Sequence, residues 1–182
     1  MNSIEKLAFD SINKDLSNNG IKRLTGKEPI AYSDLVNYSN IDELLGTEKF
    51  IVILYQTSSI NNGHWVALMV NHKNEIIFFD SYGIKYDFEQ QYGATYDKKL
   101  PKYLTNLIET DGRTVKYNTF DYQKWGKSST CGRWSSIAVN LLRKLTLEQF
   151  NQLFNTNKSS LLNNGDFMVC LLTLIGNQDL IK

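Results

Sequence analysis

Two histidines and two cysteines are the side chains of this sequence best suited to proton transfer and nucleophilic attack. His72 lies in the polar stretch NHKN, which predicts an exposed turn, whereas His64 opens the apolar run HWVALMVN. If residues 72–74 form a three-residue loop, position 66 pairs with Asp80, and His64 becomes a diagonal neighbour of Asp80 on one face of a sheet. A two-residue loop would separate the two side chains onto opposite faces. An odd loop length therefore predicts an imidazole paired with a carboxylate. The alternative is that Asp80 only begins the turn DSYG.

Cys131 stands at the start of the segment CGRWSSIAVNLLRKL, whose apolar spacing predicts a helix over residues 131–145. The free N–H groups and the dipole at a helix N-terminus stabilise a thiolate, which is the nucleophilic form of cysteine. Gly132 lacks a side chain where a substrate carbonyl would approach the Cys131 amide. Cys170 lies in the apolar stretch FMVCLL and is predicted to be a buried hydrophobe. We therefore expect Cys131 to be the nucleophile.

Gln123 precedes Cys131 by eight residues and carries a neutral amide donor. Near the start of the cysteine helix, this donor and the Cys131 N–H could hold the oxyanion formed during acyl transfer. A metal site built from the two histidines and two cysteines is not expected, because no two of these residues share a short motif. We accordingly expect neither a metal nor another cofactor.

The elements that must position these residues follow from the hydrophobic periodicity and the turn residues. We predict helices over residues 3–16, 101–110, 131–145 and 147–154, short helical turns at 33–36 and 41–45, strands over 49–56, 64–71, 75–80 and 114–118, and a buried helix or strand over 167–175. The three strands between residues 49 and 80 are apolar on both faces, which predicts helices on both sides of a mainly antiparallel sheet. The fold class is therefore α+β.

Length and charge limit what the chain can be. Its 182 residues are predicted to form one domain (1–182), with a helical part at about 1–47, the sheet and catalytic core at about 48–145, and C-terminal helices at about 146–182. The formal charge of +1 excludes polyanion binding driven by bulk charge alone. The longest apolar run, 167–172, is too short for a membrane span, and the N-terminus does not resemble a signal peptide. We expect a soluble protein in a reducing, intracellular setting.

Four motifs in this order resemble the adenain-like cysteine endopeptidases, which include adenovirus, virophage and large DNA virus proteases and the SUMO-deconjugating proteases. They are GHWVAL at 63–68, FFDSYG at 78–83, Gln123, and STCG at 129–132. The resemblance implies a papain-related protease fold in which His64 acts as general base and acid, Asp80 orients it, Cys131 attacks the substrate, and Gln123 lies in the oxyanion hole. Trp65 resembles the family's aromatic residue that borders the substrate cleft.

The resemblance also implies a biological role. We expect a monomeric enzyme that cleaves viral precursor proteins at glycine-containing sites during capsid or core maturation, in the virion and the host cytoplasm. The DNA and peptide activators of some adenovirus relatives are not carried over, because no cysteine here matches a covalent activator site. The alternatives are a SUMO or ubiquitin deconjugating protease, a Cys-His-Asp acyltransferase, and an inactive protease scaffold in the virion.

The two cysteines should differ in reactivity, since only Cys131 combines a helix N-terminus with a nearby base. A limiting amount of an alkylating reagent should label Cys131 before Cys170, as measured by peptide mass spectrometry. Preferential labelling of Cys170, or full activity of the Cys131→Ala variant, would contradict the assignment of the nucleophile.

Overall fold

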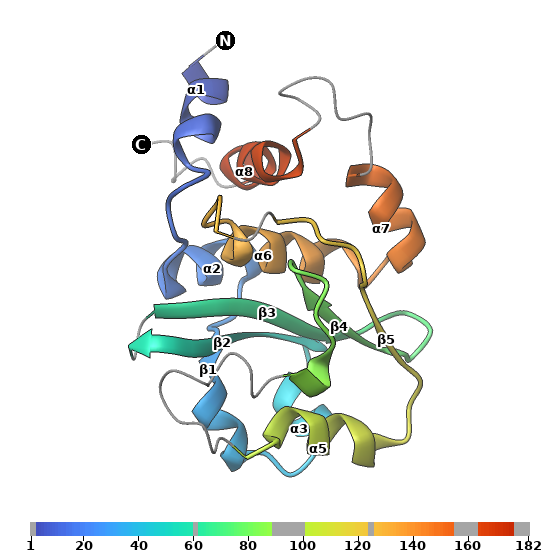
Figure 1. Ribbon diagram of the computed structural model, residues 1–182. Coiled ribbons are helices and arrows are strands. Elements are labelled where there is room, and N and C mark those ends of the chain that lie inside the picture. The colour runs from blue at the N-terminus through green and yellow to red at the C-terminus, as the bar shows by residue number, and fades with distance from the viewer. Residues whose placement is uncertain (1–2, 60–61, 89–100, 124–125, 155–163, 177–182) are drawn as a thin grey trace.

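A five-stranded sheet lies at the centre of the computed structural model, which describes residues 3–59, 62–88, 101–123, 126–154 and 164–176 (Figure 1). The strands are β1 (Ile30–Ala31), β2 (Phe50–Ser59), β3 (Asn62–Val70), β4 (Ile76–Asp80) and β5 (Val115–Tyr117), and they lie side by side in sequence order. The pairs β2–β3 and β3–β4 are antiparallel, whereas the short strands β1 and β5 join the two edges in parallel. The predicted α+β class and the three central strands are confirmed. The edge strand β1 was not predicted.

Helices cover both faces of the sheet, as the apolar runs predicted (Figure 1). The helical elements in the described ranges are α1 (Ser3–Asp10), α2 (Asn18–Thr25), η1 (Tyr32–Asn37), α3 (Ile41–Leu45), η2 (Tyr86–Phe88), α5 (Tyr103–Asp111), α6 (Cys131–Leu141), α7 (Leu147–Phe154) and α8 (Gly165–Gly176). One core lies between the sheet and the layer that contains α2, α6, α7 and α8, and a second lies between the sheet and α3, α5 and η1. Successive side chains of β2 enter the two cores alternately: Val52 and Leu54 enter the first, and Ile51 and Ile53 the second.

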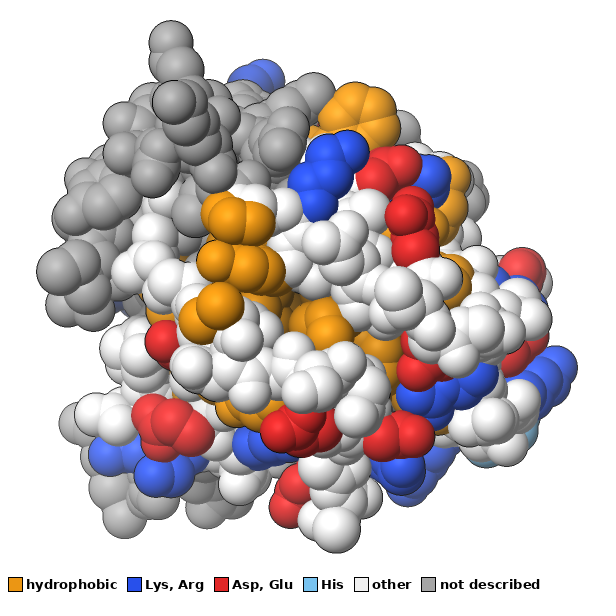
Figure 2. All heavy atoms as spheres, turned by 90° about the horizontal axis from the view of Figure 1, so that it is seen from below, with side chains coloured by type: hydrophobic (Ala, Val, Ile, Leu, Met, Phe, Trp, Pro, Cys, Tyr) orange, Lys and Arg blue, Asp and Glu red, His pale blue; other side chains and the backbone are white. Residues whose placement is uncertain are grey.

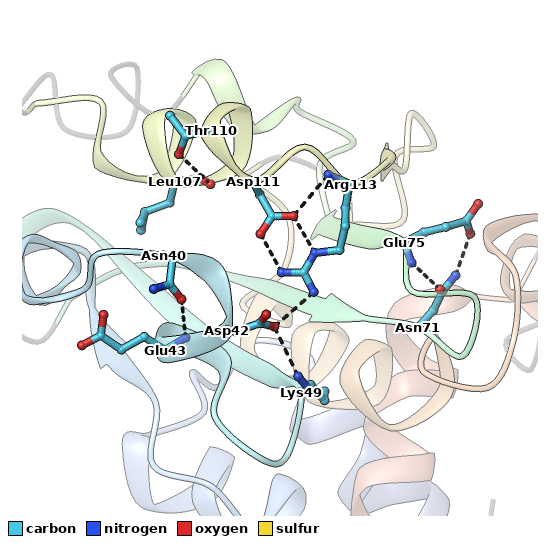
Figure 3. A network of polar contacts seen from close by, with 10 residues as sticks. All are labelled: Asn40, Asp42, Glu43, Lys49, Asn71, Glu75, Leu107, Thr110, Asp111 and Arg113. Carbon is cyan, nitrogen blue, oxygen red and sulfur yellow. Dashed lines mark hydrogen bonds and ion pairs between the residues drawn. The ribbon is translucent and has the colours of Figure 1, made fainter.

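The loop between β3 and β4 sets the register on which the functional site depends. The side-chain oxygen of Asn71 accepts hydrogen bonds from the main-chain N–H groups of Lys73 and Glu75, both at 2.9 Å, and its amide donates to the Glu75 carboxylate (Figure 3). The main-chain N–H of Asn71 donates to the Glu75 carbonyl at 3.0 Å, so residues 72–74 form the loop. Val66 consequently pairs with Asp80. The register expected for a three-residue loop is confirmed.

A charged network links α3 to the turn between α5 and β5, on the side of the sheet away from α6 (Figure 3). The guanidinium of Arg113 lies between two carboxylates, with Nη1 at 3.1 Å from Asp42 and Nη2 at 2.6 Å from Asp111. Lys49 adds a further contact to Asp42 at 3.2 Å. Acidic and basic side chains are intermixed across this side of the molecule, with hydrophobic ones between them (Figure 2). As far as the described residues go, this face has no continuous basic surface of the kind that binds a nucleic acid backbone.

The predicted helix over residues 3–16 is wrong in its second half. Helix α1 ends at Asp10, and the next helix, α2, begins at Asn18, capped by Ser17, whose side chain accepts a hydrogen bond from the Gly20 N–H. Between the two helices, the Ile12 carbonyl accepts a hydrogen bond from the Ser129 N–H at 2.8 Å, and Leu16 is buried in the first core. These long-range contacts override the local helical spacing of the apolar residues.

Three further elements agree with the sequence. The predicted helix over 147–154 is α7, and Thr146 and Gln149 form a capping box at its start, with reciprocal hydrogen bonds of 2.9 and 3.2 Å. Helix α5 follows Pro101 and ends before Gly112, whose φ of 84° is left-handed. The apolar run 167–175, for which helix and strand were both open, belongs to α8. Its amino end is capped by Asn164, whose side-chain oxygen accepts a hydrogen bond from the Asp166 N–H at 3.1 Å.

Gly63, which precedes His64, lies where β2 and β3 approach too closely for a side chain. A Cβ at this position would stand 1.8 Å from the main-chain oxygen of Tyr55. We expect Gly63→Ala to lower the free energy of unfolding by about 1–3 kcal/mol or more, because the main chain itself must move. Denaturant unfolding checks this value. Gly176→Ala is the matched control, since no atom lies within 4 Å of its Cβ position. Equal stability of the two variants would contradict the expected clash.

Candidate active site

The start of β3, the end of β4 and the start of α6 bring together His64, Asp80 and Cys131. His64 and Asp80 are 5% and 0% exposed, and the His64 Nε2 lies 2.9 Å from the Asp80 Oδ1. Cys131 lies within interaction range of the same imidazole, and its side chain helps to raise the pKa of His64. The imidazole therefore joins the carboxylate to the thiol.

Asp80 is held by main-chain contacts as well as by the histidine. Its Oδ1 also accepts a hydrogen bond from the Tyr82 N–H at 2.8 Å, so Asp80 begins the turn that the sequence suggested and pairs with His64 too. Asn118, just after β5, brackets the residue: its side-chain oxygen accepts from the Asp80 N–H at 3.0 Å, and its amide donates to the Asp80 carbonyl at 2.6 Å. Asn118 lies at the end of the predicted strand 114–118, and no local sequence pattern indicates this role.

The charge on the histidine is governed by competing effects. Burial is the largest single effect on the pKa of His64 and lowers it. The Asp80 carboxylate, its hydrogen bond and the interaction with Cys131 together outweigh burial, and they raise the pKa from 6.5 to about 10. The imidazole is consequently protonated at neutral pH. A protonated imidazole beside a thiol at a helix N-terminus is the environment that stabilises a thiolate.

A carboxylate of α8 holds the residue that precedes Cys131. Thr130 occupies the N-cap position of α6, but its hydroxyl donates to the Asp166 carboxylate at 2.5 Å and does not cap the helix. The same carboxylate accepts a hydrogen bond from the Trp134 Nε1 at 2.9 Å. These contacts hold the first turn of α6 in place. Because the Thr130 side chain does not cap the helix, it accepts no hydrogen bond from the main-chain N–H groups of that turn. Sequence reasoning did not find this role of Asp166, since the contact joins segments 36 residues apart.

Cys170 has a different environment from Cys131. It is 0% exposed and packs between α1 and α8 with Ala8, Phe167 and Leu174. Burial raises the pKa of the Cys170 thiol to about 12, so this group stays protonated and inert at neutral pH.

Gln123 is 1% exposed and is held at both ends of its side-chain amide. Its Oε1 accepts a hydrogen bond from the Ser81 hydroxyl at 2.8 Å, and its Nε2 donates to the Ser128 carbonyl at 2.8 Å. The amide nitrogen carries two hydrogens, and the bond to Ser128 uses one of them. Gln123 is thereby attached both to the residue after Asp80 and to the segment that leads into Cys131.

Trp65 and Gly132 lie next to each other, where β3 meets the start of α6. Trp65 is 6% exposed and packs in the first core. A Cβ on Gly132 would meet the side chains of Leu16 and Trp65, each at 3.0 Å. The missing side chain therefore allows α6 to pack closely against Trp65 and the segment before α2. The approach of a substrate carbonyl to this glycine stays a prediction.

Tyr82 completes the surroundings of the histidine. Its ring stacks on the His64 imidazole, with ring centroids 4.6 Å apart and an interplanar angle of 19°. Partial burial, followed by the nearby charges of Cys131 and Asp80, raises the pKa of the Tyr82 hydroxyl, which stays neutral. Tyr82 belongs to the motif FFDSYG, but no role was predicted for it.

Within the described ranges, no group of three or more His, Cys, Asp or Glu side chains could hold a metal ion. None of the helices in those ranges is long and apolar enough to cross a membrane.

Comparisons with known proteins place these features in context. No family model matches the chain. An uncharacterised protein of the Sputnik virophage, V9, is 30% identical over 152 residues, which cover 81% of this chain and 86% of that protein. Among solved structures, the chain is similar to the central domain of an uncharacterised Legionella pneumophila protein, with a TM-score of 0.43, 15% identity, and coverage of 91% of this chain and 98% of that one. It is also similar to the SUMO protease Ulp1, with a TM-score of 0.43, 13% identity, and coverage of 100% and 88%.

The pKa of His64 predicts how stability depends on pH. Because the folded pKa of about 10 exceeds the unfolded value of 6.5, the stabilisation by the imidazolium is complete below pH 6.5 and is lost as the pH rises toward 10. Asp80→Asn keeps an oxygen for the Tyr82 N–H but removes the carboxylate charge. The stability difference between wild type and Asp80→Asn should therefore shrink as the pH rises, as measured by denaturant unfolding at several pH values. Parallel pH profiles of the two proteins would contradict the charged pair.

Proposed function

We propose that this chain, which belongs to the family of the Sputnik virophage protein V9, is a cysteine endopeptidase whose nucleophile is Cys131. The observation that carries the proposal is the buried imidazole of His64, which contacts the Asp80 carboxylate on one side and Cys131 on the other. This is the arrangement of nucleophile, base and orienting group that acyl transfer requires. The motif resemblance to the adenain-like endopeptidases points to the same chemistry.

The geometry supports a two-step mechanism. The Cys131 thiolate attacks the carbonyl carbon of the scissile peptide bond, a C–S bond forms, and the carbonyl electrons move to oxygen. When this intermediate collapses, the C–N bond breaks and the His64 imidazolium gives its proton to the leaving amine. The neutral imidazole then takes a proton from water as the water attacks the thioester. Cys131 leaves as the thiolate, and the imidazolium is restored.

Two donors serve the oxyanion in this mechanism. One is the main-chain N–H of Cys131, which lies in the first turn of α6, where N–H groups have no acceptor within the helix. The other is the second Nε2 hydrogen of Gln123, whose side chain is attached to Ser128 three residues before the nucleophile. Donors fixed in advance cost no reorganisation when the negative charge develops.

The substrates we propose are viral capsid or core precursor proteins, cleaved by a monomer at glycine-containing sites in the virion or the host cytoplasm. Support comes from the motif resemblance and from the viral source of the relative. Trp65 is 6% exposed, comparable with His64 at 5% and Cys131 at 7%, and its place beside the cleft, like the preference for glycine, rests on the resemblance.

Incubation of the purified chain with virophage structural precursors tests this function. New termini at glycine-containing sites, mapped by mass spectrometry and absent with Cys131→Ala, are the expected result. Turnover of SUMO or ubiquitin conjugates alone would identify a deconjugating protease. Acetyl transfer from an added acyl cofactor would identify an acyltransferase. Either of these results would overturn the maturation role.

The oxyanion assignment predicts the effect of one substitution. Gln123→Ala removes the side-chain donor and should lower kcat by about 10²-fold or more, with a smaller change in KM, because the donor acts on charge that exists only in the transition state. Steady-state kinetics of the folded variant measure both constants. An unchanged kcat would mean that the oxyanion donors lie elsewhere.

A further inference from the structure

We propose that Ser81 is a positioning residue whose buried hydroxyl holds the Gln123 amide in its working orientation. The proposal rests on the proposed function, since it assigns Ser81 a role in the same oxyanion hole. Ser81 is 0% exposed and directly follows Asp80, between the two ends of the site.

Ser81 contacts Gln123 through both its main chain and its side chain. The Ser81 carbonyl accepts hydrogen bonds from the N–H groups of Tyr122, at 2.9 Å, and Gln123, at 3.0 Å. The Ser81 hydroxyl lies 2.8 Å from the Gln123 Oε1. The main-chain bonds place the Gln123 backbone, so the hydroxyl contact is the part of this pairing that acts on the side-chain amide.

The orientation of the amide follows from its two partners. The Ser128 carbonyl can only accept a hydrogen bond, so the Gln123 Nε2 must face it, and Oε1 then faces Ser81. The Ser81 hydroxyl supplies the donor that this buried oxygen needs. Without that donor, Oε1 would be buried with no partner at that end, and the amide would rotate away from the geometry that aims its second hydrogen at the oxyanion.

The position of Ser81 also couples the two halves of the site. Asp80 orients the general base, and the next residue orients the oxyanion donor, within a turn closed by the Gly83 N–H and the Asp80 carbonyl at 2.9 Å. The base and the oxyanion donor are therefore fixed to one short segment. Gly83, with a φ of 70°, packs against the main chain of residues 119–120, which leaves this turn little room to move.

A double-mutant cycle tests whether Ser81 acts through Gln123. Ser81→Ala should lower kcat by about 10- to 100-fold with little change in KM, because a misplaced donor stabilises the transition state poorly. In the Gln123→Ala background, the same substitution should change kcat by less than about twofold. Ser81→Cys, which keeps a weak donor of similar size, should give an intermediate kcat.

Ser136→Ala is the matched control for loss of a buried serine hydroxyl. Ser136 is 0% exposed, and its hydroxyl donates to the Gly132 carbonyl within α6 at 2.8 Å. Its kcat should stay at the wild-type value. An equal effect of Ser81→Ala in both backgrounds, or an unchanged kcat in the folded single variant, would overturn the proposal.

Nuclear magnetic resonance separates this proposal from the proposed function. In ¹⁵N-glutamine-labelled protein, the side-chain NH₂ signals of Gln123 are assigned by their loss in Gln123→Ala. Ser81→Ala should shift or broaden these signals, and Ser136→Ala should leave them in place. Unmoved signals in Ser81→Ala would overturn the positioning role even if the wild type is an active protease. An inactive wild type with the expected shifts would overturn the proposed function alone.

Discussion

The hydrogen bond between His64 and Asp80 joins two side chains that are almost completely removed from water. A buried carboxylate and a buried imidazole each require a hydrogen-bond partner. A shift of β3 relative to β4 would leave both side chains buried without this partner. The register that pairs Val66 with Asp80 is therefore both a packing requirement and an electrostatic one. Asn71, at the other end of the β3–β4 hairpin, maintains this register by closing a three-residue loop. The odd loop length keeps His64 and Asp80 on the same face of the sheet. The charge on the imidazole is a consequence of this register.

The second constraint is the place where α6 begins. The helix contacts the sheet through the Ser135 hydroxyl, which donates to the Trp65 carbonyl at 3.0 Å, and through Gly132, which has no side chain to hold α6 away from Trp65. This close packing places Cys131 near the imidazole. Asp166 of α8 accepts a hydrogen bond from the hydroxyl of Thr130, the residue before Cys131, and so holds it in place. Under the proposed mechanism, the sheet supplies the base, the helix supplies the nucleophile, and the segment leading into the helix contacts the oxyanion donor. Each group is fixed by bonds made before a substrate arrives.

The sequence predicted those parts of the structure that depend on local patterns. The β-branched and aromatic runs identified the three central strands, and loop parity placed His64 beside Asp80. The contacts of Asn118 and Asp166 escaped prediction, because they join segments that are distant in the sequence and have no repeating pattern. The same limit explains the turns between α1 and α2, where burial of Leu16 overrides helical spacing. Trp65 fitted a cleft-lining motif, but only the packed structure shows that its ring is buried.

The charge state of His64 can be measured directly, because the chain contains only two histidines. In ¹⁵N-histidine-labelled protein, the ring signals of His64 are identified by comparison with a His72→Gln variant. We predict that both ring nitrogens of His64 carry the chemical shifts of an imidazolium at neutral pH, and that these shifts change only as the pH approaches about 10. A neutral His64 ring at pH 7, titrating near the ordinary value of 6.5, would contradict the charged pair on which this account of the site depends.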